Sequence, residues 1–128
     1  FVAVGERSDD VVREQAQDRA SGLGKVFRID QKGQAIADNP FVGKEDALPE
    51  IWSYGHRNTQ SAALDNDGRL WIVEHGPRGG DELNRPQAGL NYGWPVATYG
   101  VEYSGEPVGE GITAKSGTEL NARAILGA

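Results

Sequence analysis

Short apolar and polar alternation, broken by turn residues, is the feature that most restricts how this sequence can fold. Residues 61–64 and 69–74 flank Asp65-Asn66-Asp67-Gly68, and the Asp-Gly step supplies the positive φ that a tight hairpin turn requires. The sequence therefore predicts an antiparallel hairpin here. Glycine accounts for 18 of the 128 residues, about twice its usual share of roughly 7%. This excess favours a turn-rich all-β fold.

Other segments alternate in the same way. In a strand over 50–55, Ile51 and Ser53 would share one face. Trp52 and Tyr54 would occupy the opposite face. The remaining expectations are strands at 1–5, 24–30 and 96–99, a loop or short surface helix at 9–20, and loops at 76–84 and 91–95.

Two turns share one pattern: an apolar residue, Asp, two polar residues and Gly. It occurs at 29–33 and again at 64–68. Hairpins that recur at intervals of roughly 40 to 50 residues are typical of β-propeller blades. The repeat is therefore compatible with a propeller, but two copies do not establish one.

Charge and the lengths of the apolar runs exclude two classes of function. The 13 Lys and Arg residues against 19 Asp and Glu give a net charge of −6, which would repel the phosphates of nucleic acid. No apolar run approaches the roughly 20 residues needed to cross a bilayer. We therefore predict no nucleic-acid partner and no membrane span. The chain has no Met and begins inside a strand-like run, so we expect it to be cut or processed from a longer protein.

The segment Gly55-His56-Arg57-Asn58 is one candidate binding site. The guanidinium of Arg57 is a fixed fork of donors, and Asn58 adds an amide, so the pair suits a planar ligand with acid and carbonyl groups. The alternative is a turn in which Arg57 pairs with an Asp or Glu. His56 and His75 lack a third residue that would complete a transition-metal site, and we interpret both as structural residues.

The Gly- and acid-rich segment 76–82 is a second candidate. Gly and Pro expose backbone carbonyls, and the acids add oxygen ligands of the kind that Ca²⁺ prefers. A flexible charged loop is the alternative, because the spacing of an EF-hand loop is absent. Aromatic side chains could stack on a sugar or a flat cofactor, but we expect Trp52 and Trp71 to fill space between sheets.

Five segments, in this order and spacing, resemble one known family. They are 24–29 (GKVFRI), 38–41 (DNPF), 50–58 (EIWSYGHRN), 74–84 (EHGPRGGDELN) and 91–95 (NYGWP). The chain resembles, from about residue 1 to 109, the soluble aldose sugar dehydrogenases that use pyrroloquinoline quinone (PQQ), the glucose/sorbosone dehydrogenase family. We describe residues 1–128 as part of one such domain, with an altered or truncated tail from about residue 111.

The resemblance implies a six-bladed β-propeller, of which this chain would cover roughly two blades. It also implies two cofactors, PQQ and Ca²⁺. By position in the family motifs, the PQQ-binding residues would be Arg57, Asn58 and Tyr103. The main-chain carbonyls of Gly76 and Pro77 would bind the catalytic Ca²⁺, and Glu82 and Tyr92 would bind a further Ca²⁺.

The implied reaction is oxidation of an aldose at C1 to the lactone, with hydride passing to PQQ, which Ca²⁺ polarises. The family's catalytic His lies upstream of the region that matches Phe1, so no catalytic residue is assigned here, and we expect this piece alone to be inactive. The implied partners are an aldose substrate and an external electron acceptor, in the periplasm or outside the cell. The oligomeric state is left open, a homodimer being one option. Two alternatives remain: a non-catalytic propeller that binds sugar or protein, and a Ca²⁺-dependent lactonase.

Overall fold

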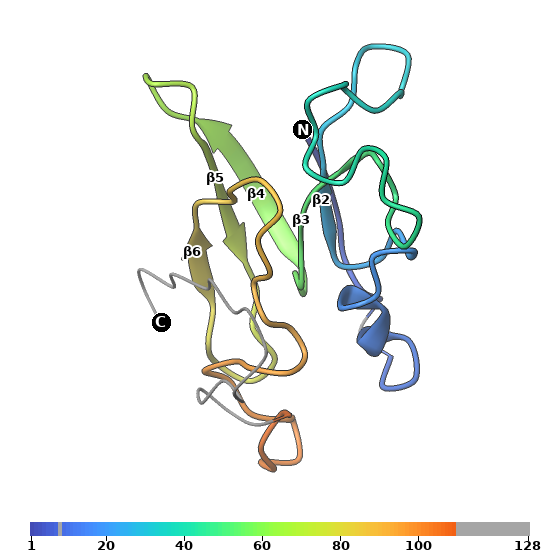
Figure 1. Cartoon of the computed structure of the whole chain (residues 1–128). Coiled ribbons are helices and arrows are strands. Elements are labelled where there is room, and N and C mark those ends of the chain that lie inside the picture. Colours follow the sequence, from blue (N-terminus) through green and yellow to red (C-terminus); the bar gives the residue numbers. More distant parts are fainter. Residues whose placement is uncertain (8, 110–128) are drawn as a thin grey trace.

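The computed structural model describes residues 1–7 and 9–109, which form two three-stranded antiparallel sheets lying side by side (Figure 1). The first sheet has the order β1-β2-β3, with β1 at Val2–Val4, β2 at Lys25–Phe27 and β3 at Ile51–Tyr54. The second has the order β4-β5-β6, with β4 at Thr59–Leu64, β5 at Leu70–Glu74 and β6 at Glu82–Asn84. The prediction of an all-β fold is confirmed, and two sheets agree with an expectation of about two blades.

The predicted hairpin is formed by β4 and β5. Its register pairs Leu64 with Leu70 across the turn, where Gly68 has a φ of 75°. Asp65 Oδ1 accepts the N–H groups of Asp67 and Arg69, at 3.0 and 2.9 Å. The side chain of Asp65 therefore fixes the turn that sets the register of the hairpin.

The repeat noticed in the sequence corresponds to one turn geometry used twice. Asp30 Oδ1 accepts the N–H groups of Lys32 and Gln34, at 2.8 and 2.9 Å. Gly33 has a φ of 80°, as its counterpart Gly68 has a φ of 75°. The two Asp residues thus close equivalent turns in successive units.

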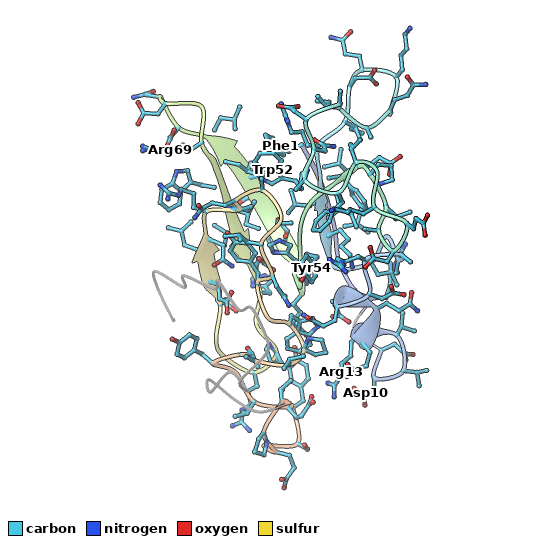
Figure 2. The ribbon with its side chains drawn as sticks, viewed as in Figure 1. Phe1, Asp10, Arg13, Trp52, Tyr54 and Arg69 are labelled. Atoms are coloured by element: carbon cyan, nitrogen blue, oxygen red, sulfur yellow. The ribbon has the colours of Figure 1, made fainter. Side chains whose placement is uncertain are left out.

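The apolar core that joins the two sheets contains Val26 from β2 and Leu70 and Ile72 from β5, with Trp52 packed against it. The ring of Phe1 meets Trp52 edge-on, with centroids 5.5 Å apart, and both side chains lie between the sheets in Figure 2. Trp52 therefore fills space between the sheets, as predicted.

Two local expectations were wrong, and one was confirmed in part. Residues 82–84 form β6, because β5 offers them a free edge to pair with. Residues 96–99 form no strand, and the preceding Trp94–Pro95 peptide bond is cis. Lys25, for which the sequence predicted no burial state, is fully buried. The polar segment at 9–20 does contain a short 3₁₀ helix, η1, at Arg13–Ala16.

Within residues 1–7 and 9–109, no helix has the length and apolar character that crossing a membrane requires. The altered tail expected from about residue 111 lies outside the described residues.

Candidate functional site

Loops that follow β3 and β5 meet a third loop, around residue 101, at one end of the sheets. The N–H of His75 donates to the carbonyl of Asn58 at 3.0 Å. Arg78 and Val101 exchange two backbone hydrogen bonds, at 2.9 and 3.2 Å. Segments that the sequence singled out separately are thus tied together by their backbones.

Arg57 lies at the centre of this junction and is only 9% exposed. Its Nη1 donates to the carbonyls of His75 and Gly76, at 3.1 and 2.7 Å. Its guanidinium carbon lies 5.1 Å from the centroid of the Trp94 ring, a cation–π distance. Within the described residues Arg57 forms no ion pair with a carboxylate, and its buried Nε has no hydrogen-bond partner. The alternative of a turn closed by an Arg57 ion pair is therefore not what the structure shows.

The loop after β5 folds tightly over Gly76. A Cβ at this position would collide with the carbonyl oxygen of Gly79, so only glycine fits without rearrangement. The N–H of Gly76 donates to Asp81 Oδ1 at 2.9 Å. This hydrogen bond, supported by His75, lowers the pKa of Asp81. The loop conformation, and with it the direction of the Gly76 carbonyl, is thereby fixed.

A cleft of about 670 Å³ brings three of the predicted residues together: Arg57, Pro77 and Tyr103. Tyr103 is 74% exposed. An ion pair of 2.6 Å between Arg13 Nη1 and Glu102 Oε1 ties η1 to the loop that carries Tyr103. Arg13 lies with Asp10 at the opposite end of the molecule from the hairpin tip at Arg69 (Figure 2).

The other predicted residues lie around two further cavities. Gly76, Glu82 and Tyr92 line a cavity of about 10 Å³ that Arg57 also reaches, about the size of one water molecule or ion. Asn58 lies apart from both, in a groove of about 430 Å³ beside β1. Arg57 lines all three cavities.

Tyr92 uses its hydroxyl group to fix the loop around it. The hydroxyl donates to the carbonyl of Arg85 at 2.7 Å and accepts the N–H of Gln87 at 3.0 Å. A metal would have to compete for the hydroxyl with these two bonds.

A buried chain of hydrogen-bonded polar side chains, which the sequence did not reveal, runs from β3 across β5 to β6. Its members are Ser53, His56, Glu74, Asn84 and Glu82. His56 Nε2 lies 2.8 Å from Ser53 Oγ, and His56 Nδ1 lies 2.6 Å from Glu74 Oε1. Asn84 Nδ2 donates to both Glu74 and Glu82, at 3.0 and 2.8 Å. One signal in the sequence could have found it: Glu74 continues the inward positions of Leu70 and Ile72 on β5.

The pKa values of Glu74 and Glu82, the two carboxylates of this buried polar chain, shift in opposite directions. Burial opposes ionisation of Glu74, but His56, Asn84 and the N–H of Arg57 outweigh it and lower the pKa of Glu74. Burial dominates at Glu82 and raises its pKa to about 7. Although Ser53, His56 and Glu74 have the order of a hydrolase triad, Ser53 is fully buried and cannot meet a substrate.

Comparison with known proteins identifies the family of this chain. Residues 1–123 match the family model described as glucose/sorbosone dehydrogenase. The chain belongs to this family. It is 49% identical over 111 residues to aldose sugar dehydrogenase YliI of Escherichia coli, covering 86% of this chain and 29% of YliI.

Solved structures of aldose sugar dehydrogenases are also similar to this chain. The apo form of the soluble E. coli aldose sugar dehydrogenase matches with a TM-score of 0.85 and 43% identity, over 98% of this chain and 35% of that one. The PQQ-bound aldose sugar dehydrogenase of Streptomyces coelicolor matches with a TM-score of 0.62 and 36% identity, over 81% and 28%. The chain thus spans about a third or less of its relatives' length.

Proposed function

We propose that the protein containing this chain oxidises aldose sugars at C1 to the lactone, with PQQ as the hydride acceptor and Ca²⁺ as the metal. The observation that supports this most is the position of Arg57. Arg57 lines all three cavities, and its guanidinium keeps a buried donor without a partner. A bound acceptor would satisfy that donor.

The donors around the cleft suit the acid and quinone oxygens of PQQ. Three residues that line it, Arg13, Arg57 and Trp94, each have one buried side-chain N–H without a partner. Buried donors left unpaired cost free energy, and oxygen acceptors would remove that cost.

The charge of the cleft implies that an acidic cofactor needs a cation. The acidic side chains that line it outnumber the two guanidinium groups; they are Glu6, Asp9, Asp10 and Glu102. Ca²⁺ would offset this negative charge. The same carboxylates could accept hydrogen bonds from sugar hydroxyl groups.

The residues around the small cavity suit calcium, which prefers oxygen ligands. The Gly76 carbonyl accepts one bond from Arg57 and has a second lone pair for a metal. Asn84 Oδ1 is a buried acceptor without a partner, next to Glu82. The described residues contain no cluster of three or more His, Cys, Asp or Glu side chains. The catalytic ion would therefore depend on the main-chain carbonyls of Gly76, at the small cavity, and Pro77, at the cleft, with Glu82 and Tyr92 for a further ion.

In this mechanism, residues of this chain would bind the cofactor and stabilise the charge that develops during the reaction. When bound, PQQ supplies the two-electron acceptor for the C1 hydride. Arg57, held against Trp94 and the Gly76 carbonyl, would stabilise the negative charge that develops beside it. Asn58 and Tyr103 would make further contacts with the cofactor, Asn58 from its groove beside β1. His56 has both ring nitrogens engaged and is buried, so we assign it no proton transfer from the sugar.

The experiment uses the full-length protein, expressed and loaded with PQQ and Ca²⁺. We expect dye reduction that depends on an added aldose, and its absence in every loaded sample would refute the proposal. Lactone hydrolysis without PQQ would instead indicate a lactonase, and sugar binding without turnover a non-catalytic propeller. We also propose an external electron acceptor, a location in the periplasm or outside the cell, and no activity for residues 1–128 alone.

A further inference from the structure

The carboxylate of Glu74 is the centre of the buried polar chain. Its side chain is 5% exposed and lies at the end of β5. Oε1 accepts hydrogen bonds from His56 Nδ1 at 2.6 Å and Asn84 Nδ2 at 3.0 Å. Oε2 accepts the main-chain N–H of Arg57 at 3.0 Å. One carboxylate thus joins the segment after β3 to β6.

Arg57 is held at both of its ends by consecutive groups of one segment. Glu74 binds its main-chain N–H, and the carbonyls of His75 and Gly76 bind its guanidinium. Fixing both ends of a long side chain leaves it few rotamers. The position of the guanidinium therefore depends on where Glu74 holds the backbone.

Glu82 is tied to the same carboxylate through one amide. Asn84 Nδ2 donates to Glu74 Oε1 and to Glu82 Oε2. Displacing Glu74 would remove one of these two partners. The orientation of the Asn84 amide, and with it the Glu82 carboxylate, would then be less well defined.

Only a carboxylate can satisfy the three donors at once. A Gln side chain has one acceptor oxygen, and its NH₂ group would face another donor. At least one buried donor would then lose its acceptor. An Asp side chain keeps both oxygens and the charge, but it is one methylene shorter.

We propose that Glu74 is a positioning residue, whose carboxylate holds the Arg57 backbone and, through Asn84, the Glu82 side chain in one rigid arrangement. This rests on the proposed function for the identity of the ligands, PQQ at Arg57 and Ca²⁺ at Glu82. Glu74 acts on them through these other residues. Partners of this kind typically change metal affinity or activity by about 10- to 100-fold.

The test compares Glu74→Gln, Glu74→Asp and Asp65→Asn with the wild type, all in the full-length protein. Asp65 is the matched control, because its carboxylate also accepts several hydrogen bonds but at the far hairpin turn. The measurements are amide hydrogen exchange of residues 55–58 and 82–84 without ligands, Ca²⁺ affinity by calorimetry, PQQ affinity by absorbance and the melting temperature.

We expect Glu74→Gln to speed exchange at 55–58 and to weaken PQQ and Ca²⁺ binding by about 10- to 100-fold. Glu74→Asp keeps both oxygens but is one methylene shorter, so it should weaken binding and speed exchange to a smaller extent than Glu74→Gln. Asp65→Asn should lower only the melting temperature. Wild-type affinities and exchange in Glu74→Gln would overturn the proposal. If Glu74→Gln does not fold, Glu74→Asp decides: weaker binding with faster exchange at 55–58 supports the proposal, and wild-type values of both overturn it.

The failure of the proposed function would look different. In that case the wild type would bind neither PQQ nor Ca²⁺. Faster exchange at residues 55–58 and 82–84 in Glu74→Gln would still show that Glu74 positions the two segments. Unchanged exchange would reject the positioning role as well.

Discussion

Lys25, in the first sheet, and Arg57, at the end of the second, are both buried cations, and they are satisfied in different ways. In the first sheet, Lys25 Nζ donates to the carbonyls of Gln15, Ala16 and Leu23, at 2.9, 3.0 and 2.6 Å. An ammonium group has three donors, so its capacity is filled. At the end of the second sheet, Arg57 has two carbonyl partners for Nη1 and none for Nε.

This difference separates a structural residue from one that we propose binds a ligand. Lys25 ties η1 and the residues that follow it to β2 and needs nothing from outside the chain. Arg57 lines three cavities and lacks an acceptor that a ligand could supply. Changes at Lys25 should therefore act on stability, and changes at Arg57 on binding and turnover.

The largest effect is expected at Arg57. In the loaded full-length protein, Arg57→Lys should lower kcat with an aldose by about 10²- to 10³-fold, because a point charge replaces the fork that stabilises developing charge. The melting temperature should change little. Arg78→Lys is the control, since Arg78 is exposed on the neighbouring loop. The dye-reduction rate is measured for both variants. Equal rates in the two variants would show that Arg57 has no role in the reaction.

Removal of calcium should produce the next largest effect. Chelation in the full-length protein should lower stability by about 2.7 kcal/mol relative to Ca²⁺ at 100 times its dissociation constant. Hydrogen exchange should accelerate at residues 75–84, where the proposed ligands lie. Residues 13–27, around Lys25, should stay protected. Loosening of both regions alike would contradict a metal site confined to the second sheet.

Lys25→Met should destabilise the protein by about 1 to 3 kcal/mol, because buried carbonyls lose hydrogen-bond donors. The activity per folded molecule should be unchanged. Chemical denaturation and active-site titration with PQQ separate the two quantities. A variant of normal stability with poor turnover would reverse the roles that we assign to Lys25 and Arg57.

The smallest effect is a pH dependence of that stability difference. Burial lowers the pKa of Lys25 to about 8, whereas the unfolded chain keeps a value near 10.4. Between these values unfolding takes up a proton, so wild-type stability rises with pH relative to Lys25→Met, by at most about 1.4 kcal/mol per pH unit. Denaturation curves at pH 8 and 9 measure the change. A stability difference between the wild type and Lys25→Met that decreases with rising pH would contradict the burial of the ammonium group.

Local sequence patterns predicted those elements whose conformation is determined by residues close in sequence. The Asp-Gly step fixed the turn at Gly68, and alternation placed Ile51 and Ser53 on one face of a strand, which the structure shows to be the buried face of β3. The strand at 82–84 was not predicted, because its pairing with β5, and not its own composition, makes these residues a strand. The burial of Lys25 depends on carbonyls from η1 and the segment after it, about which β2 itself contains no information.

The candidate site shows the same limit. The Arg57-Asn58 and Gly76-Pro77 motifs are contiguous in sequence and were found directly. The link between them is Glu74, whose partners lie 17 and 18 residues before it and 10 residues after it. Such contacts appear only when strands pair. Asn58 is adjacent to Arg57 in sequence, yet it lines the groove beside β1 and not the cleft.

A crystal structure of the full-length protein with PQQ and Ca²⁺ tests the central claim most directly. We predict that PQQ contacts the Arg57 guanidinium and that a calcium ion lies about 2.3 to 2.6 Å from the Gly76 and Pro77 carbonyl oxygens. Lys25 should keep its three carbonyl partners. PQQ bound away from Arg57, or a Gly76 carbonyl that has Arg57 as its only partner in the loaded protein, would contradict the account.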